Sequence, residues 1–198
     1  MAIEFEAKVL LTAEEFINIM TEKNLGFAAF SLCKKEDEYW SRYSSVKESI
    51  ENNESLTRIR EDVNGTILTL KKKKMDGNFE NNQELETRIQ NRFVIEALLK
   101  EAGYRPYFNK YKTSWRLDIR KDIDIADVDV NAEIEIIENT KNKSNPNYKC
   151  FYAIEIEAVS NNEALTNEYL SKVIKNAFHL FDKTERDFET RSWQELLA

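Results

Sequence analysis

Hydrophobic and polar residues alternate along several segments of the chain, a pattern typical of β-strands with one apolar and one polar face. Residues 3–9 read IEFEAKV, so Glu4, Glu6 and Lys8 share one face while the apolar side chains share the other. Charged residues of one parity recur further along, at Arg58 and Arg60, Lys71 and Lys73, Glu84 and Glu86, Lys110, Lys112 and Arg116, and Glu155 and Glu157. These segments therefore predict strands that each carry an ionic face.

Two architectures accommodate such strands. In a flat sheet with helices on its apolar face, the ionic face would be solvated surface. In a closed barrel, the ionic faces would converge on a central channel, and helices would cover the apolar outside. The repeated pairs of acids and bases on one strand after another favour the barrel.

The remaining pattern divides the chain into elements. Strands are predicted at residues 2–11, 36–42, 55–62, 66–74, 82–89, 107–119, 124–138 and 149–159, and helices at 12–23, 91–102, 160–181 and 192–197. The segment Thr12-Ala13-Glu14-Glu15 has the form of a capping box, and Asn64-Gly65 predicts a tight hairpin. Residues 43–54 and 139–148 are polar and are predicted to be mobile loops.

Composition indicates one globular domain over residues 1–198, with 41% hydrophobic and 33% charged residues. The net charge of −7 argues against a general nucleic-acid binder. No apolar run approaches the ~18 residues of a membrane span, and no signal peptide is predicted. Cys33 and Cys150 lack metal-binding spacing, so we expect reduced thiols in a cytoplasmic protein.

Taken in order, the charged motifs resemble those of the CYTH group, also called triphosphate tunnel metalloenzymes, over roughly residues 2 to 180. The matching motifs are Glu-x-Glu-x-Lys from Glu4, Arg-x-Arg from Arg58, Leu-Thr-x-Lys ending at Lys71, and Glu-x-Glu from Glu84 and from Glu155. The resemblance implies an α+β fold, in which an eight-stranded antiparallel barrel with helices packed outside forms a tunnel for a triphosphate and divalent cations. Members include thiamine triphosphatases, inorganic tripolyphosphatases, class IV adenylate cyclases and fungal-type RNA triphosphatases.

This resemblance implies a role for each charged group. Cationic side chains would bind the phosphates: Lys8, Arg58, Arg60, Lys71, Lys73, Lys112, Arg116 and, on the C-terminal helix, Lys172. Carboxylates contact phosphate favourably only through a cation, so Glu4, Glu6, Glu155 and Glu157 are predicted ligands of Mg²⁺ or Mn²⁺. The predicted catalytic residues are Lys8, Arg60, Glu84 and Glu86.

Several assignments stay open at this point. Glu133 and Glu135 have the same local pattern as Glu155 and Glu157, which are preferred because the acidic motif should lie on the last strand. Asp127 and Asp129 are candidates for a single acid on the preceding strand, and Lys175 is an alternative to Lys172. Relatives often carry Lys-x-Arg on the sixth strand, whereas here Ser114 follows Lys112 at that spacing and Arg116 comes one step later. Trp40, Trp115 and Trp193 are predicted to serve packing.

The leading functional hypothesis is a metal-dependent hydrolase acting on tripolyphosphate, thiamine triphosphate or a nucleoside triphosphate. The alternatives are an adenylate cyclase that converts ATP to cyclic AMP and pyrophosphate, and a module that binds triphosphates without turnover. Many carboxylates favour catalysis, because a simple anion receptor gains nothing from them. The expected partner is a small triphosphate, with neither membrane nor nucleic acid, and a homodimer stays open.

Overall fold

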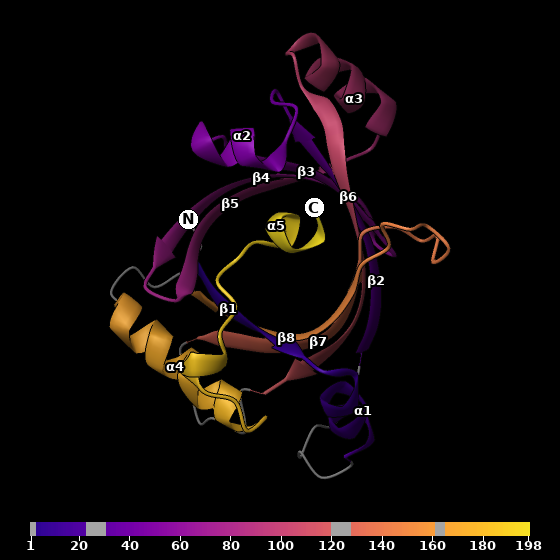
Figure 1. Ribbon diagram of the computed structural model, residues 1–198. Coiled ribbons are helices and arrows are strands. Elements are labelled where there is room, and N and C mark those ends of the chain that lie inside the picture. Colours follow the sequence, from indigo (N-terminus) through magenta and orange to yellow (C-terminus); the bar gives the residue numbers. More distant parts are fainter. Residues whose placement is uncertain (1–2, 23–30, 120–127, 161–164) are drawn as a thin grey trace.

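The computed structural model describes residues 3–22, 31–119, 128–160 and 165–198. Its strands form one closed barrel in the order β1-β5-β4-β3-β2-β6-β7-β8, with antiparallel pairing between neighbours (Figure 1). They are β1 (Ile3–Leu11), β2 (Ser31–Ser41), β3 (Leu56–Asp62), β4 (Gly65–Asp76), β5 (Phe79–Ile89), β6 (Arg105–Asp118), β7 (Asp129–Glu138) and β8 (Cys150–Ser160). The predicted eight-stranded antiparallel barrel is confirmed.

The helices of the described residues are α1 (Ala13–Thr21), α2 (Val46–Glu51), α3 (Arg92–Glu101), α4 (Asn167–His179) and α5 (Trp193–Leu197), with a short 3-10 helix at Glu185–Asp187. Among these residues, no helix has both the length and the apolar character needed to cross a membrane.

Helix α4 covers the outer wall of the barrel where β1 and β8 lie side by side (Figure 1). It is amphipathic, and its buried side chains are Leu170, Val173, Ile174, Ala177 and Phe178. These side chains join the outward-facing apolar positions of the strands, such as Phe5, Ile154 and Ile156, in the main hydrophobic core. The apolar strand faces therefore lie outside the barrel, which leaves the ionic faces inside.

Helix α1 begins at the predicted capping box. The Oγ1 atom of Thr12 accepts a hydrogen bond from the amide of Glu15 at 3.1 Å, and the Glu15 carboxylate accepts one from the amide of Thr12 at 2.8 Å. The hairpin at Asn64-Gly65 is also present, and Gly65 supplies a φ of 118°, which suits a residue without a side chain. These two features could be predicted from the sequence because each depends on contacts within a few residues.

The structure corrects several predicted elements, including β5, which begins at Phe79 instead of residue 82. The segment 43–54 contains helix α2, which Ser45 starts by accepting a hydrogen bond from the amide of Glu48 at 3.2 Å. Strand β2 begins at Ser31 instead of residue 36, because the whole segment pairs with β6. Helix α4 begins after its N-cap Thr166, since residues up to Ser160 belong to β8. Residues 120–127 and 161–164, which the predicted strand 124–138 and helix 160–181 partly include, lie outside the described residues.

Helix α5 adds a feature that the sequence pattern did not predict. At one end of the barrel the inward-facing positions change from charged to apolar, as at Leu10 and Phe108. These side chains, with Ile137, Phe151 and Ala153, pack against Trp193, Leu196 and Leu197 of α5. Seen along the barrel, α5 lies within the ring of strands (Figure 1). The C-terminal helix therefore closes this end of the barrel interior.

Candidate active site inside the barrel

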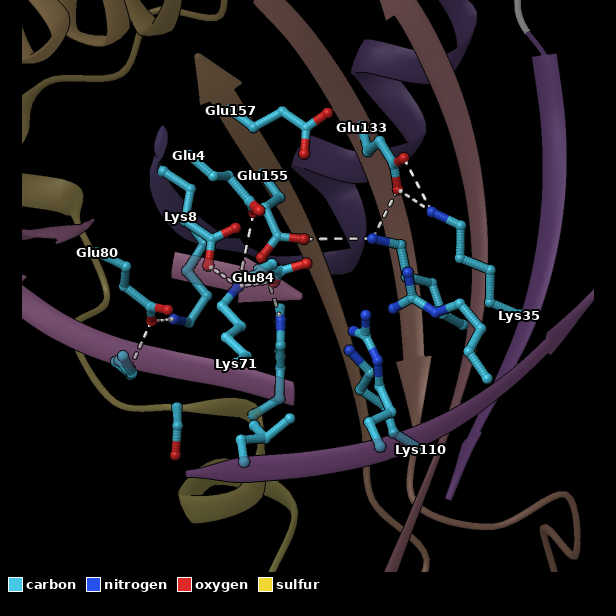
Figure 2. Close-up of a pocket in the computed structure, with 18 of the residues that line it drawn as sticks. Glu4, Lys8, Lys35, Lys71, Glu80, Glu84, Lys110, Glu133, Glu155 and Glu157 are labelled. Atoms are coloured by element: carbon cyan, nitrogen blue, oxygen red, sulfur yellow. Dashed lines mark hydrogen bonds and ion pairs between the residues drawn. The ribbon is translucent and has the colours of Figure 1, made fainter. Parts of the chain in front are cut away.

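The barrel encloses a cavity of about 390 Å³ whose lining is mostly charged (Figure 2). The lining contains every predicted site residue except Lys172: Glu4, Glu6, Lys8, Arg58, Arg60, Lys71, Lys73, Glu84, Glu86, Lys112, Arg116, Glu155 and Glu157. Exposure rises away from α5, from 4% for the Lys8 side chain to 49% for that of Arg116. The cavity therefore opens at the end opposite the C-terminal helix.

Strand register gathers the carboxylates on one wall. In the pairing of β1 with β8, Glu6 lies opposite Glu157 and Lys8 lies opposite Glu155. In the next pairing, Glu155 lies opposite Glu133 of β7. Directly opposed residues in antiparallel strands have neighbouring side chains on one face. Acids far apart in the sequence therefore form one cluster, named here the acidic wall: Glu4, Glu6, Glu84, Glu133, Glu155 and Glu157.

Two lysines lie within the acidic wall, Lys71, which is largely buried, and Lys112, which is buried. The Lys71 Nζ atom is 2.9 Å from carboxylate oxygens of both Glu6 and Glu84 and 3.5 Å from one of Glu4 (Figure 2). Burial alone would lower the pKa of Lys71, but the surrounding carboxylates outweigh burial and raise the pKa well above its ordinary value. Lys71 is thus charged at neutral pH and balances the negative charge of the carboxylates around it.

Lys112 has the same role further along the wall. Its Nζ atom is 2.6 Å from Glu133 and 3.2 Å from Glu155, and it also pairs with Glu135. Glu135 is fully buried, and neither of its oxygens has a hydrogen bond of good geometry among the described residues. Glu133 therefore lines the same cavity as Glu155 and Glu157, whereas Glu135 is buried beside Lys112 and is not part of the lining within the described residues.

Cationic side chains form the opposite wall, named here the basic wall: Lys35, Arg58, Arg60 and Lys110. The Nη2 atom of Arg58 donates to Thr69 Oγ1 at 3.0 Å and to Glu86 Oε1 at 3.3 Å. The Nε atom of Arg58 is buried and has no hydrogen-bond partner among the described residues. A buried guanidinium with an unsatisfied donor is suited to an anionic ligand.

Sequence reasoning missed several residues that line or support the cavity. Lys35 and Tyr39 line it from β2, and Glu80 pairs with Lys8 at 3.1 Å. Trp193 was predicted to serve packing, yet its ring also lines the cavity and its Nε1 atom donates to Glu155 at 3.4 Å. The parity of Lys35 and Tyr39 was visible in the sequence, but the predicted strand began too late to include Lys35.

Some of the candidate site residues do not line the cavity among the described residues. Lys172 is exposed on α4, outside the barrel, because the opposite face of that helix packs on the strands. Asp129 is exposed at the start of β7 and is not part of the cavity lining within the described residues, and Asp127 lies outside those residues. Lys175, the alternative on α4, pairs with Glu185 at 2.6 Å.

A CYTH domain model matches residues 2–184, nearly the whole chain. The chain belongs to the CYTH family. The resemblance of the motifs implied a charged barrel interior, and the structure places these motif residues in the cavity lining.

Three solved structures show the same fold as this CYTH chain. The PH1012 protein from Pyrococcus horikoshii OT3 has a TM-score of 0.70 at 21% identity, covering 98% of this chain and 99% of that one. A putative adenylate cyclase from Vibrio parahaemolyticus has a TM-score of 0.62 at 15% identity, covering 98% and 97%. The Hippeastrum protein HpAC1, a putative adenylyl cyclase described as having a dominant triphosphatase activity, has a TM-score of 0.52 at 12% identity, covering 99% and 93%. Among curated proteins, no sequence matches this chain.

The CYTH family is a family of divalent-metal enzymes, and the acidic wall has the right donors for such an ion. Carboxylate oxygens are the preferred ligands of Mg²⁺ and Mn²⁺. In the described residues, however, no three acidic, histidine or cysteine side chains converge closely enough to hold an ion as they stand. Lys71 and Lys112 lie between the acids, so the donor chemistry fits a metal while the side chains would have to rotate to bind one.

Proposed function

We propose that this CYTH protein is a triphosphatase that depends on a divalent metal ion and hydrolyses a small triphosphate-bearing substrate inside the barrel. The observation that carries the proposal is the separation of charge across one cavity, with the acidic wall facing the basic wall (Figure 2). A polyphosphate ligand needs cations on one side. It also benefits from carboxylates on the other side when a metal ion lies between them and the phosphate.

The basic wall supports the binding part of the proposal. Arg58 and Arg60 line the cavity from β3 and Lys110 lines it from β6, on the other side of β2, and their side chains are at most 16% exposed. Phosphate oxygens would accept charge-assisted hydrogen bonds from these groups, which are strong in a site with little water. Lys8, Lys73 and Arg116 would extend the contact along the chain of phosphates, while Lys71 and Lys112 would do so after leaving their carboxylate partners.

The acidic wall supports the catalytic part. Glu4, Glu6, Glu155 and Glu157 would hold Mg²⁺ or Mn²⁺, and the bound ion would supply an activated water and neutralise phosphate charge. Glu84 lies beside these acids through its contact with Lys71, and Glu86 lies where the cavity opens, with a side chain 44% exposed. These two carboxylates would orient the attacking water by accepting its hydrogen bonds.

Product analysis of the purified protein tests the proposal. The protein would be incubated with Mg²⁺ or Mn²⁺ and, in separate reactions, tripolyphosphate, thiamine triphosphate, ATP and GTP, with orthophosphate, pyrophosphate and cyclic nucleotide measured separately. We expect release of orthophosphate that stops with EDTA. Pyrophosphate together with cyclic AMP would replace the proposal by a cyclase, and binding without any product would reduce the site to a receptor.

A further inference from the structure

We propose that Asp37 is a positioning residue that holds the basic wall in the arrangement needed to bind phosphate. This inference rests on the proposed function, since it assigns a role within the same site. Asp37 lies on β2, its side chain is fully buried, and it is not part of the cavity lining among the described residues. It would therefore act through its cationic neighbours and not by touching the substrate.

Strand register places Asp37 between two cations. It lies directly opposite Arg60 on β3 and directly opposite Lys110 on β6. Because all three residues have the same parity relative to the barrel wall, their side chains point to the same side. A carboxylate in the middle of three strands, with a cation on each flank, follows from the pairing alone.

The contacts of Asp37 use both of its oxygens. Arg60 donates from Nε to Oδ1 at 2.6 Å and from Nη2 to Oδ2 at 3.0 Å. Lys110 Nζ is 3.3 Å from Oδ2, Arg58 Nη1 is 3.9 Å from it, and the Tyr39 hydroxyl lies at 3.5 Å. The forked contact with Arg60 fixes the plane of that guanidinium and leaves its Nη1 donors for the cavity.

The charge state of Asp37 agrees with this geometry. Burial alone would raise its pKa, but the charges of Arg60, Lys110 and Arg58 outweigh burial and hold the pKa well below its usual range. The carboxylate is thus ionised at neutral pH. It offsets the mutual repulsion of three cations that would otherwise turn away from one another, so the cations stay in place before a phosphate arrives.

Positioning and simple charge predict opposite effects of Asp37→Asn. The substitution adds one net positive charge behind the cavity, which by charge alone would strengthen the binding of an anion. If Asp37 positions the cations, the loss of the forked contact instead weakens binding and slows turnover. The direction of the change therefore separates the two roles.

The test uses the full chain and inorganic tripolyphosphate, with binding measured by calorimetry in EDTA and with KM and kcat measured in Mg²⁺. We expect Asp37→Asn to weaken binding about tenfold or more, in line with the loss of charge-assisted hydrogen bonds. Asp37→Glu, which keeps the charge and displaces the carboxylate by one methylene, should recover part of this loss. Glu36→Gln is the matched control, because Glu36 is the neighbouring acid on β2, faces outward and pairs with Lys141 at the surface.

Nitrogen NMR of the Arg60 Nε–H group provides a readout that needs no ligand. In the wild type this proton should exchange slowly, and in Asp37→Asn it should exchange fast or disappear. Equal or tighter tripolyphosphate binding by a folded Asp37→Asn protein would overturn the inference. If that variant does not fold, unchanged binding by Asp37→Glu would overturn it instead. A wild type that neither binds nor hydrolyses tripolyphosphate, thiamine triphosphate, ATP or GTP in the presence of Mg²⁺ would contradict the proposed function, and its NMR signal would still report whether Asp37 holds Arg60.

Discussion

Replacement of Lys71 by methionine tests the charge balance of the acidic wall. The Lys71 ammonium contacts Glu6 and Glu84 at 2.9 Å and Glu4 at 3.5 Å, and the lysine side chain is 12% exposed. Methionine fills most of the same space but leaves three carboxylates without this partner. Removal of one partner from a buried ion pair costs about 3–5 kcal/mol, and the 11–19% exposure of these carboxylates places the expected loss near about 3 kcal/mol.

The loss should depend on pH, and its sign follows from the pKa shifts. Lys71 has a raised pKa in the folded protein, so its own contribution to stability is fully present below the unfolded lysine pKa and is constant at neutral pH. Although burial alone would raise the pKa of Glu84, Lys71 and Arg58 lower it, so the contribution of Glu84 is present above the unfolded carboxyl pKa and is lost as pH falls. Without Lys71 the carboxylates hold protons more tightly. The variant should therefore be most destabilised near about pH 8 and approach the wild type toward about pH 4–5.

Urea denaturation near about pH 8 and about pH 5 measures both effects. A loss of about 3 kcal/mol corresponds to a melting temperature lower by about 6–12 °C for a chain of this size. Lys72→Met is the matched control, since Lys72 is the next residue on β4 and is exposed, and its change should stay within about 0.5 kcal/mol. A Lys71→Met protein as stable as the control, or a loss that is the same at both pH values, would refute the reasoning.

Three further predictions concern activity and the core. Glu6→Gln should abolish metal-dependent phosphate release while the melting temperature stays close to that of the wild type, and unchanged turnover would remove Glu6 from the proposed metal site. Glu133→Gln should reduce kcat less than Glu155→Gln, because two lysines already neutralise Glu133 at 2.6 and 3.1 Å. The reverse order in parallel kinetic assays would show that the proposed metal ligands lie on the wrong strand. Phe178→Ala should destabilise the fold by about 3–5 kcal/mol in urea titrations without changing KM, since this fully buried ring lies outside the barrel, and a raised KM would contradict that separation.

Much of the barrel could be predicted from the sequence because strand alternation is a local property. Glu4, Glu6 and Lys8 share a face in any extended backbone, and the same holds for Arg58 and Arg60. The capping box at Thr12 likewise depends on atoms three residues apart. Such signals do not require knowledge of which strand lies beside which.

Helix α2 and the start of β2 were not predicted correctly from local sequence signals. Residues 43–54 are polar and helix α2 buries none of its residues, so only a serine cap distinguishes this six-residue helix from a loop. Strand β2 extends to Ser31 because β6 supplies hydrogen-bond partners along its whole length. The extent of β2 therefore depends on a neighbour that is distant in sequence, whereas the signal for α2 is local but weak.

The amino-acid sequence by itself determined which side chains are paired on one face, and hence that the chain has an ionic and an apolar side. Tertiary structure decided which of these side chains meet. The register brought Asp37 between Arg60 and Lys110, turned Glu133 toward the same cavity as Glu155 and Glu157, and placed Trp193 at the closed end of that cavity. The physical reason is that alternation fixes only the face of a strand, whereas closure of the barrel fixes the position along it and therefore the partner of every charge.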